Sequence, residues 1–81
     1  MTDMEKAELL NGILNYLKDN GRTNDLYGFR GGPGDPTIRR ALKGLEKMGY
    51  VKLTIPEDSD EIYLVTLTDT GFNFIQKSKF I

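Results

Sequence analysis

Residues 35–51, which read DPTIRRALKGLEKMGYV, decide the fold. Asp35 is a favourable N-cap, and Pro36 suits the first helical position because its φ is already helical and its missing N–H would have no partner there. Gly49 is typical of a helix end. Between them, apolar residues recur with the i, i+3, i+4, i+7 spacing of a buried helix face: Ile38, Ala41, Leu42, Leu45 and Met48. The pattern predicts a helix over residues 36–48.

The other side of this predicted helix is basic. Its four cations are spaced to lie together on one solvent-facing side, opposite the apolar residues. These cations are Arg39, Arg40, Lys43 and Lys47. Residues 22–52 carry seven basic and three acidic side chains, a local charge of +4, although the whole chain has a net charge of −1. Residues 53–70 carry five acidic side chains and no basic one. The near-neutral total therefore hides a basic segment centred on one helix.

Upstream of the basic segment, apolar residues at helical spacing predict a helix over about residues 3–20. Gly12 lies inside it, where glycine costs about 1 kcal/mol relative to alanine, and so predicts a close packing contact. Residues 22–36 are harder to assign. Thr23 or Asn24 is suited to cap one or two helical turns, which would precede a loop rich in glycine and proline.

Downstream, two strands are predicted over residues 50–55 and 62–67, since the first alternates apolar with polar residues and the second is rich in β-branched and aromatic ones. A polar hairpin loop, 56–61, joins them. Thr68 or Asp69 would cap a short last helix. The predicted order of helix, short helix, helix, strand, strand, helix indicates an α+β domain.

Composition restricts the chemistry open to this chain. Its 81 residues are expected to form one domain, 1–81, and a chain of this length buries about 60–65% of its unfolded surface, which leaves little room for an enclosed active site. It has no cysteine and no histidine, so a disulfide framework, a thiolate metal site and the commonest general base are all missing. We therefore expect a binding protein and not an enzyme, with no metal and no cofactor.

The first residues do not show the basic and then apolar pattern of a secretory signal. Apolar runs are only a few residues long, whereas about 20 are needed to span a bilayer. The sequence accordingly predicts a cytoplasmic protein with no membrane partner.

Two motifs resemble those of winged-helix proteins. Residues 36–51 combine a threonine near the helix start, a basic face, a Leu-x-x-Leu core stripe and a Gly-aromatic-Val exit. Residues 67–71, LTDTG, match the Leu-Thr-x-x-Gly pattern that ends the wing and opens the last helix. The resemblance covers about residues 3–78 and is to bacterial and archaeal regulators of the multiple-antibiotic-resistance and phenolic-acid-repressor types. It implies a winged helix, with a three-helix core, a two-stranded β-hairpin wing and a short C-terminal helix.

The resemblance also implies a transcription regulator that docks helix 36–48 in the major groove of double-stranded DNA. Arginine can bond bidentately to guanine or phosphate, lysine acts as a phosphate point charge, and the N–H groups at the helix start are suited to hold a phosphate. Arg22 and Arg30 flank the glycine-rich loop and are placed to close on a DNA backbone. The candidate nucleic-acid-binding residues are Thr37, Arg39, Arg40, Lys43, Lys47, Arg30 and Arg22.

Other interpretations stay open. A basic helix face is often only a solvated surface. A winged helix can also be a protein-interaction module without DNA contact, here through the acidic residues 57–61 or the apolar terminal helices. Those acidic residues lack the spacing of an EF-hand and are most simply a solvated turn. The glycine-rich residues 31–34 lack the Gly-Lys-Ser/Thr ending of a phosphate-binding loop.

A homodimer is predicted because the first and last helices carry more apolar residues than one buried side of each helix requires. Terminal helices with surplus apolar surface form the dimer seam in many winged-helix regulators. The alternative is a wide core stripe together with a frayed end. The candidate dimer-interface residues are Leu9, Tyr16, Phe74, Phe80 and Ile81.

Overall fold

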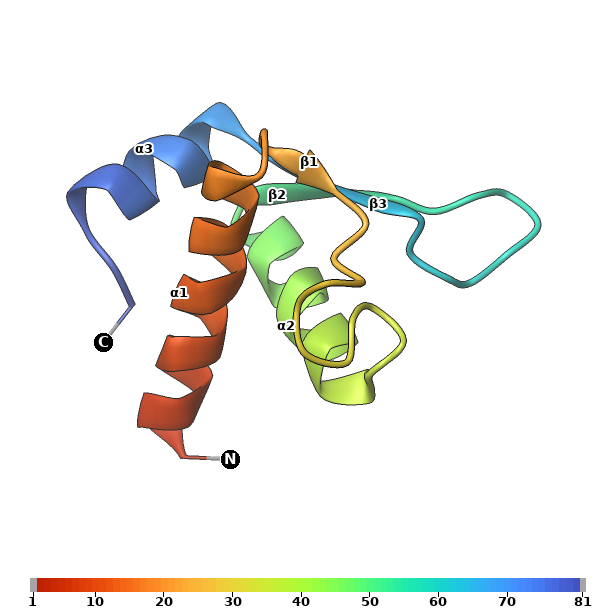
Figure 1. Ribbon diagram of the computed structural model, residues 1–81, viewed down its shortest axis with the longest axis horizontal. Helices are drawn as coiled ribbons and strands as arrows, with labels where there is room; N and C mark the ends of the chain where they lie inside the picture. Colours follow the sequence, from red (N-terminus) through yellow and green to blue (C-terminus); the bar gives the residue numbers. More distant parts are fainter. Residues whose placement is uncertain (1, 81) are drawn as a thin grey trace.

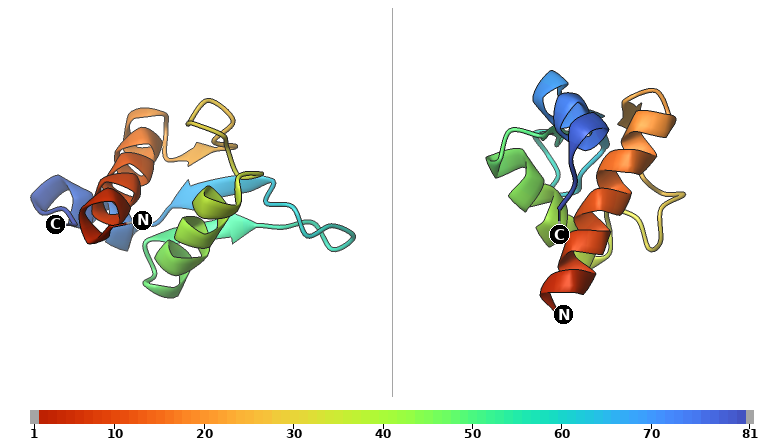
Figure 2. Two further views of the ribbon diagram at one scale, coloured as in Figure 1. Left: turned by 90° about the horizontal axis from the view of Figure 1, so that it is seen from below. Right: turned by 90° about the vertical axis from the view of Figure 1, so that its left-hand side faces the viewer.

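The computed structural model describes residues 2–80, which form three helices and a three-stranded antiparallel sheet (Figure 1). The α+β class expected from the sequence is therefore observed. In chain order the elements are α1 (Asp3–Asp19), β1 (Thr23–Asn24), α2 (Pro36–Lys47), β2 (Val51–Thr54), β3 (Leu64–Leu67) and α3 (Asp69–Lys77). The left view in Figure 2 shows α1 between α2 and α3.

The helix α1 forms where its apolar spacing predicts it, and a capping box fixes its start. The Glu5 N–H donates to Thr2 Oγ1 and the Thr2 N–H donates to Glu5 Oε1, each over 3.1 Å. Gly12 does mark a close contact, because a Cβ there would lie 3.2 Å from the Phe29 ring. One side of α1 supplies much of the core, with buried Ala7, Leu9, Leu10, Ile13, Leu14 and Leu17.

In the sheet, β3 lies between β1 and β2. Val51 and Leu53 of β2 are buried, as the alternating pattern predicts, and pair with Leu67 and Val65 of β3. Ile55 was expected on the same buried face, but 43% of it is exposed. The reason is visible in Figure 1, where the hairpin continues beyond the helices that cover the sheet.

The helical turns predicted within residues 22–36 are not formed. Thr23 and Asn24 instead make β1, which pairs with Thr66 and Val65 of β3. The Asn24 and Asp25 side chains each accept the N–H two residues ahead, and this local bonding competes with a helix cap.

Three tight turns then follow in succession, closed by backbone hydrogen bonds from residue 29 to 26, from 32 to 29 and from 35 to 32. Leu26 is fully buried with a φ of 63°, which places its side chain in the core without a helix. The predicted three-helix core followed by a separate C-terminal helix is thus wrong, because α3 is itself the third helix in the described residues. The predicted two-stranded hairpin likewise gains β1 as a third strand.

At the start of α3, the chain closes tightly on the end of α2. Thr68 caps α3 by accepting the Gly71 N–H over 3.0 Å, and its hydroxyl donates to the Gly49 carbonyl over 2.6 Å. Gly71 lies against the Tyr50 carbonyl, which a Cβ would overlap. This contact explains the glycine in the LTDTG motif.

The C-terminal segment docks on the same region. The rings of Phe74 and Tyr50 stack with centroids 4.8 Å apart, and Phe80 lies 4.9 Å from Phe74. The side-chain amide of Asn11 bonds both the N–H and the carbonyl of Phe80, each over 2.6 Å. The segment after α3 is therefore attached to α1 as far as Phe80.

Candidate nucleic-acid interface

Helix α2 has one side fixed in the core and the other free. Four of the five predicted stripe residues are buried, namely Ile38, Ala41, Leu42 and Leu45. Met48 is 44% exposed. Because the buried side is anchored on α1 and β2, the basic side opposite it is turned toward solvent.

Caps define both ends of α2. Asp35 Oδ1 accepts the N–H groups of Thr37, over 2.8 Å, and of Ile38, over 3.3 Å. Gly49, with a φ of 81°, ends the helix, and the Tyr50 N–H bonds back to the Leu45 carbonyl as in a Schellman motif. The phosphate site expected at the helix N-terminus is thus partly filled by the chain's own Asp35 carboxylate.

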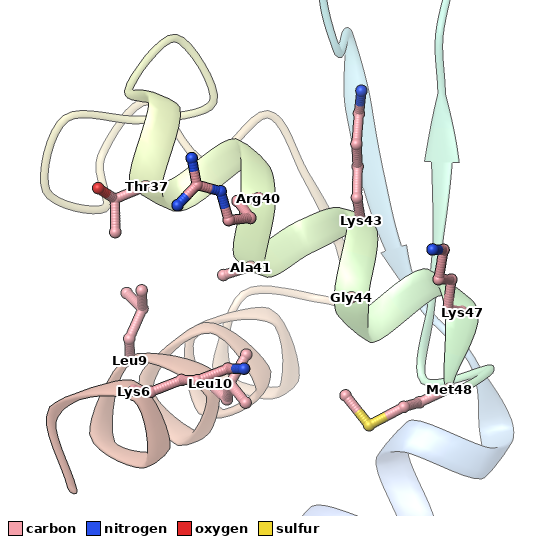
Figure 3. Close-up of a pocket in the computed structure, with 10 residues that line it drawn as sticks. All are labelled: Lys6, Leu9, Leu10, Thr37, Arg40, Ala41, Lys43, Gly44, Lys47 and Met48. Carbon is pink, nitrogen blue, oxygen red and sulfur yellow. The ribbon is translucent and has the colours of Figure 1, made fainter. Parts of the chain in front are cut away.

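A groove of about 470 Å³ runs between the exposed side of α2 and the N-terminal half of α1 (Figure 3). Four of its lining residues are cations and none is acidic. We call it the basic groove, and its lining residues are Lys6, Leu9, Leu10, Thr37, Arg40, Ala41, Lys43, Gly44, Lys47 and Met48.

The basic groove combines positive charge with an apolar floor. Figure 3 shows Leu9 and Leu10 of α1 facing Ala41 of α2, with the Met48 side chain at one end. Within residues 2–80, none of its four cations forms an ion pair. Its charge is therefore available to an anionic partner.

The structure brings together Thr37, Arg40, Lys43 and Lys47 of the predicted site, and it adds Lys6 from α1. Sequence reasoning missed Lys6, although a signal was present. Lys6 precedes Leu9 and Leu10 by three and four residues, the spacing at which helical side chains are neighbours.

Arg39 does not join this group, contrary to the expectation of a single face. It is half-buried, and its Nε has no hydrogen-bond partner in the described part of the chain. Arg39 precedes Glu46 by two helical turns and so shares its side of α2. Glu46 accepts the N–H of Leu53 in β2 over 3.0 Å, so that side faces the hairpin and not the basic groove.

Arg22 is also absent from the groove. Its guanidinium bonds the Leu67 carbonyl at 3.2 Å, pairs with Asp69 at 2.7 Å and lies 4.9 Å from the centre of the Phe72 ring. These contacts join the start of β1 to the start of α3. Arg22 thus serves the fold in this structure.

Arg30 is exposed in the tight turns before α2, with a φ of 51°. Its guanidinium lies 5.8 Å from the centre of the Phe29 ring. It does not line the basic groove, and a role in closing on a nucleic acid stays a prediction.

The hairpin loop, residues 55–63, carries the acidic cluster. Glu57, Asp58, Asp60 and Glu61 are all exposed. Across residues 2–80, no three carboxylates are placed to hold a metal ion. The loop is a solvated negative surface, and we refer to it as the acidic loop.

The residues predicted to form a dimer seam are largely used within the chain. Leu9 is only 1% exposed, Tyr16 packs edge-on against Phe29 at 5.5 Å, and Phe74 and Phe80 pack on each other and on Tyr50. Ile81 lies outside the described residues. Among the described seam residues, Leu9 is thus buried and the three aromatic side chains are partly buried against the core, and a dimer stays a prediction.

Comparisons of the chain with protein-family models, with curated proteins and with solved structures found no match. Among the described residues, no helix has the length and apolar character that a membrane span requires. Any assignment of function consequently depends on the surface of this molecule itself.

Proposed function

We propose that this protein binds double-stranded DNA through the basic groove and the adjoining side of α2. The supporting observation is the set of four cations, from two helices, that line one groove with no acidic lining residue and form no ion pair among residues 2–80. Duplex DNA carries one negative charge per about 1.7 Å of axis, so a cluster of unpaired cations gains affinity by releasing counterions.

The order of elements supports a winged-helix interpretation of this surface. A helix, a short strand, a basic helix and a β-hairpin follow one another in the described chain, and a tight-turn segment replaces the helix expected before the basic one. We propose that α2 is the recognition element and enters the major groove, which accepts one α-helix. Arg40 is the residue suited to bidentate contact, while Lys6, Lys43 and Lys47 contact phosphates.

The acidic loop limits the docking geometry. Its four carboxylates would repel a phosphate backbone, whereas DNA-reading wings often carry arginine or lysine. We therefore propose that α2 and the N-terminal half of α1 carry the contact and that the hairpin tip points away from DNA. A transcription regulator is the activity class that we propose on this basis.

The test is a titration of a labelled random duplex of about 20 base pairs at several salt concentrations between about 50 and 200 mM. With three lysine contacts to phosphate, the expected slope of log affinity against log salt is about −3. The triple variant Arg40→Ala, Lys43→Ala, Lys47→Ala should lose most of this binding. A matched control, Lys52→Ala, Lys77→Ala, Lys79→Ala, removes three exposed cations outside the groove and should keep it.

A flat titration at about 50 mM salt would exclude the proposal, because even non-specific binding rises steeply at low salt. Equal losses for the groove variant and its control would exclude the groove as the site.

A protein-binding role is the second candidate, favoured by the exposed acidic loop. It predicts capture of a partner that depends on residues 57–61 and persists when the groove cations are replaced.

A further inference from the structure

The acidic loop projects from the body of the molecule (Figure 1) and does not line the basic groove of its own chain. At its base, Ile55 and Tyr63 are 43% and 64% exposed, directly after Thr54 and before Leu64 of the paired strands. The loop therefore presents two apolar side chains behind a tip with four carboxylates.

The basic groove has the complementary composition. It offers four cations around a floor of leucine and alanine, with a half-exposed methionine at one end. The four carboxylates of the loop are opposite in sign and equal in number to the four cations of the groove, and the apolar base of the loop suits the apolar floor. Complementary potentials of this kind orient protein partners and fix their register.

We propose that the basic groove accepts the acidic loop of a second copy of this chain. The two surfaces lie on different parts of the molecule, so two association modes are open. Two copies can exchange loops reciprocally in an isologous two-fold dimer, or successive copies can associate head to tail in a heterologous ring or open chain. The contact does not use the apolar seam expected from the sequence, because among the described seam residues Leu9 is buried and Tyr16, Phe74 and Phe80 are partly buried against the core of the protomer.

The association is weak and sensitive to salt. One short loop in one groove buries less surface than the roughly 1,200 Å² of stable interfaces. The charges are exposed, and at about 0.1 M salt they are screened beyond about 10 Å. We expect self-association at high protein concentration and low salt, and monomers at high salt.

Self-association does not depend on DNA binding. Where both occur they compete, because the loop and the phosphates use the same cations. The experiment below contains no nucleic acid, so its result and the result of the duplex titration are independent.

The test is sedimentation equilibrium of the full chain at about 25 mM and about 300 mM salt, up to about 1 mM protein, a range chosen for a weak and screened contact. The groove variant is Lys6→Glu, Arg40→Glu, Lys43→Glu, and the loop variant is Glu57→Lys, Asp58→Lys, Asp60→Lys. The control, Lys52→Glu, Lys77→Glu, Lys79→Glu, changes the net charge as the groove variant does but leaves the groove intact.

The expected result is a weight-average mass that rises from 9.2 kDa toward twice that value or more for the wild type at low salt, and returns to 9.2 kDa at high salt. The groove and loop variants should each stay monomeric. A chain that carries the groove substitutions and the loop substitutions together should associate again, because its groove is then acidic and its loop basic. The control should associate, although more weakly than the wild type, because its more negative net charge makes the copies repel one another.

A wild type that stays at 9.2 kDa at every concentration and both salts would overturn the proposal. So would a loop variant that associates as the wild type does, or a control that is as monomeric as the groove variant. Failure of the chain that carries both sets of substitutions to associate would show that the loop and the groove are not partners.

Discussion

The basic side chains of this small protein lie in two kinds of environment. At the junction of β1 and α3, Arg22 is bound by a carbonyl, a carboxylate and an aromatic ring. In the basic groove, Arg40 and its neighbours have no ion-pair partner among residues 2–80. A basic residue is therefore informative about function only once its intramolecular partners are known. The number of charges along the sequence does not distinguish a cation that is paired within the chain from one that is not.

The largest effect on stability should come from the tightly packed start of α3. Gly71→Ala places a methyl group on the Tyr50 carbonyl, and we expect a loss of about 3 kcal/mol in the free energy of unfolding. Gly44→Ala is the control in the groove, where a Cβ meets nothing within 4 Å, and it should stabilise α2 by up to about 1 kcal/mol. Chemical denaturation measures both. Similar changes in the free energy of unfolding for the two variants would contradict the tight contact between Gly71 and the Tyr50 carbonyl.

The groove side should respond in binding and not in stability. Arg40→Ala or Lys43→Ala should each weaken binding to duplex DNA about five- to tenfold, because each removes one cation from the proposed contact. Each should change the free energy of unfolding by less than about 0.5 kcal/mol, since neither side chain is paired within the described chain. Lys43→Arg keeps the charge and should keep the affinity. A large loss of stability in Arg40→Ala would show that this side chain serves the fold.

Arg22→Ala should show the reverse behaviour. Removal of its carbonyl bond and of its packing on Phe72 should cost about 1 kcal/mol of stability and leave DNA affinity unchanged. Asp69→Asn should cost less, because the ion pair is exposed and such pairs contribute little. If Arg22→Ala instead weakens DNA binding as strongly as Arg40→Ala, the two groups of cations do not differ in use.

The smallest effect concerns the start of α1, which carries Lys6 into the groove. The Thr2 backbone N–H, and secondarily its hydroxyl, hold the pKa of Glu5 below its ordinary value of 4.5. A carboxyl whose pKa is lower in the folded state stabilises that state above its unfolded pKa. This stabilisation disappears as the pH falls through the folded value. At pH 7 the unfolding temperature of the wild type should therefore be slightly higher than that of Glu5→Ala. This difference in unfolding temperature should become smaller in acid, as Glu5 is protonated.

Much of the fold follows from local chemistry in the sequence. The cap at Asp35 and the stripe from Ile38 to Leu45 define α2 because both signals depend on neighbours within a few residues. The strand β1 could not be found in this way, because two residues have no periodicity and pair only with the free edge of β3. Leu26 fills the core from a backbone conformation that no apolar pattern signals.

The candidate site was predicted in part for a similar reason. Helical spacing placed Arg40, Lys43 and Lys47 together correctly, since one helix carries all three. Arg39 was misplaced because its position depends on where the hairpin lies against α2. The structural role of Arg22 could not be predicted, because its partners Leu67 and Asp69 are more than 40 residues away in the chain.

The hydrogen bonds between Asn11 and Phe80 have a consequence for the order of folding. They join residues that are 69 positions apart. Such a contact forms only after the entropy of closing a long loop has been lost, so we expect it late in folding. Until α3 and the segment after it dock, the Tyr50 ring lacks its aromatic neighbours Phe74 and Phe80. We therefore expect the environment of Tyr50 to reach its native state only in the last step of folding.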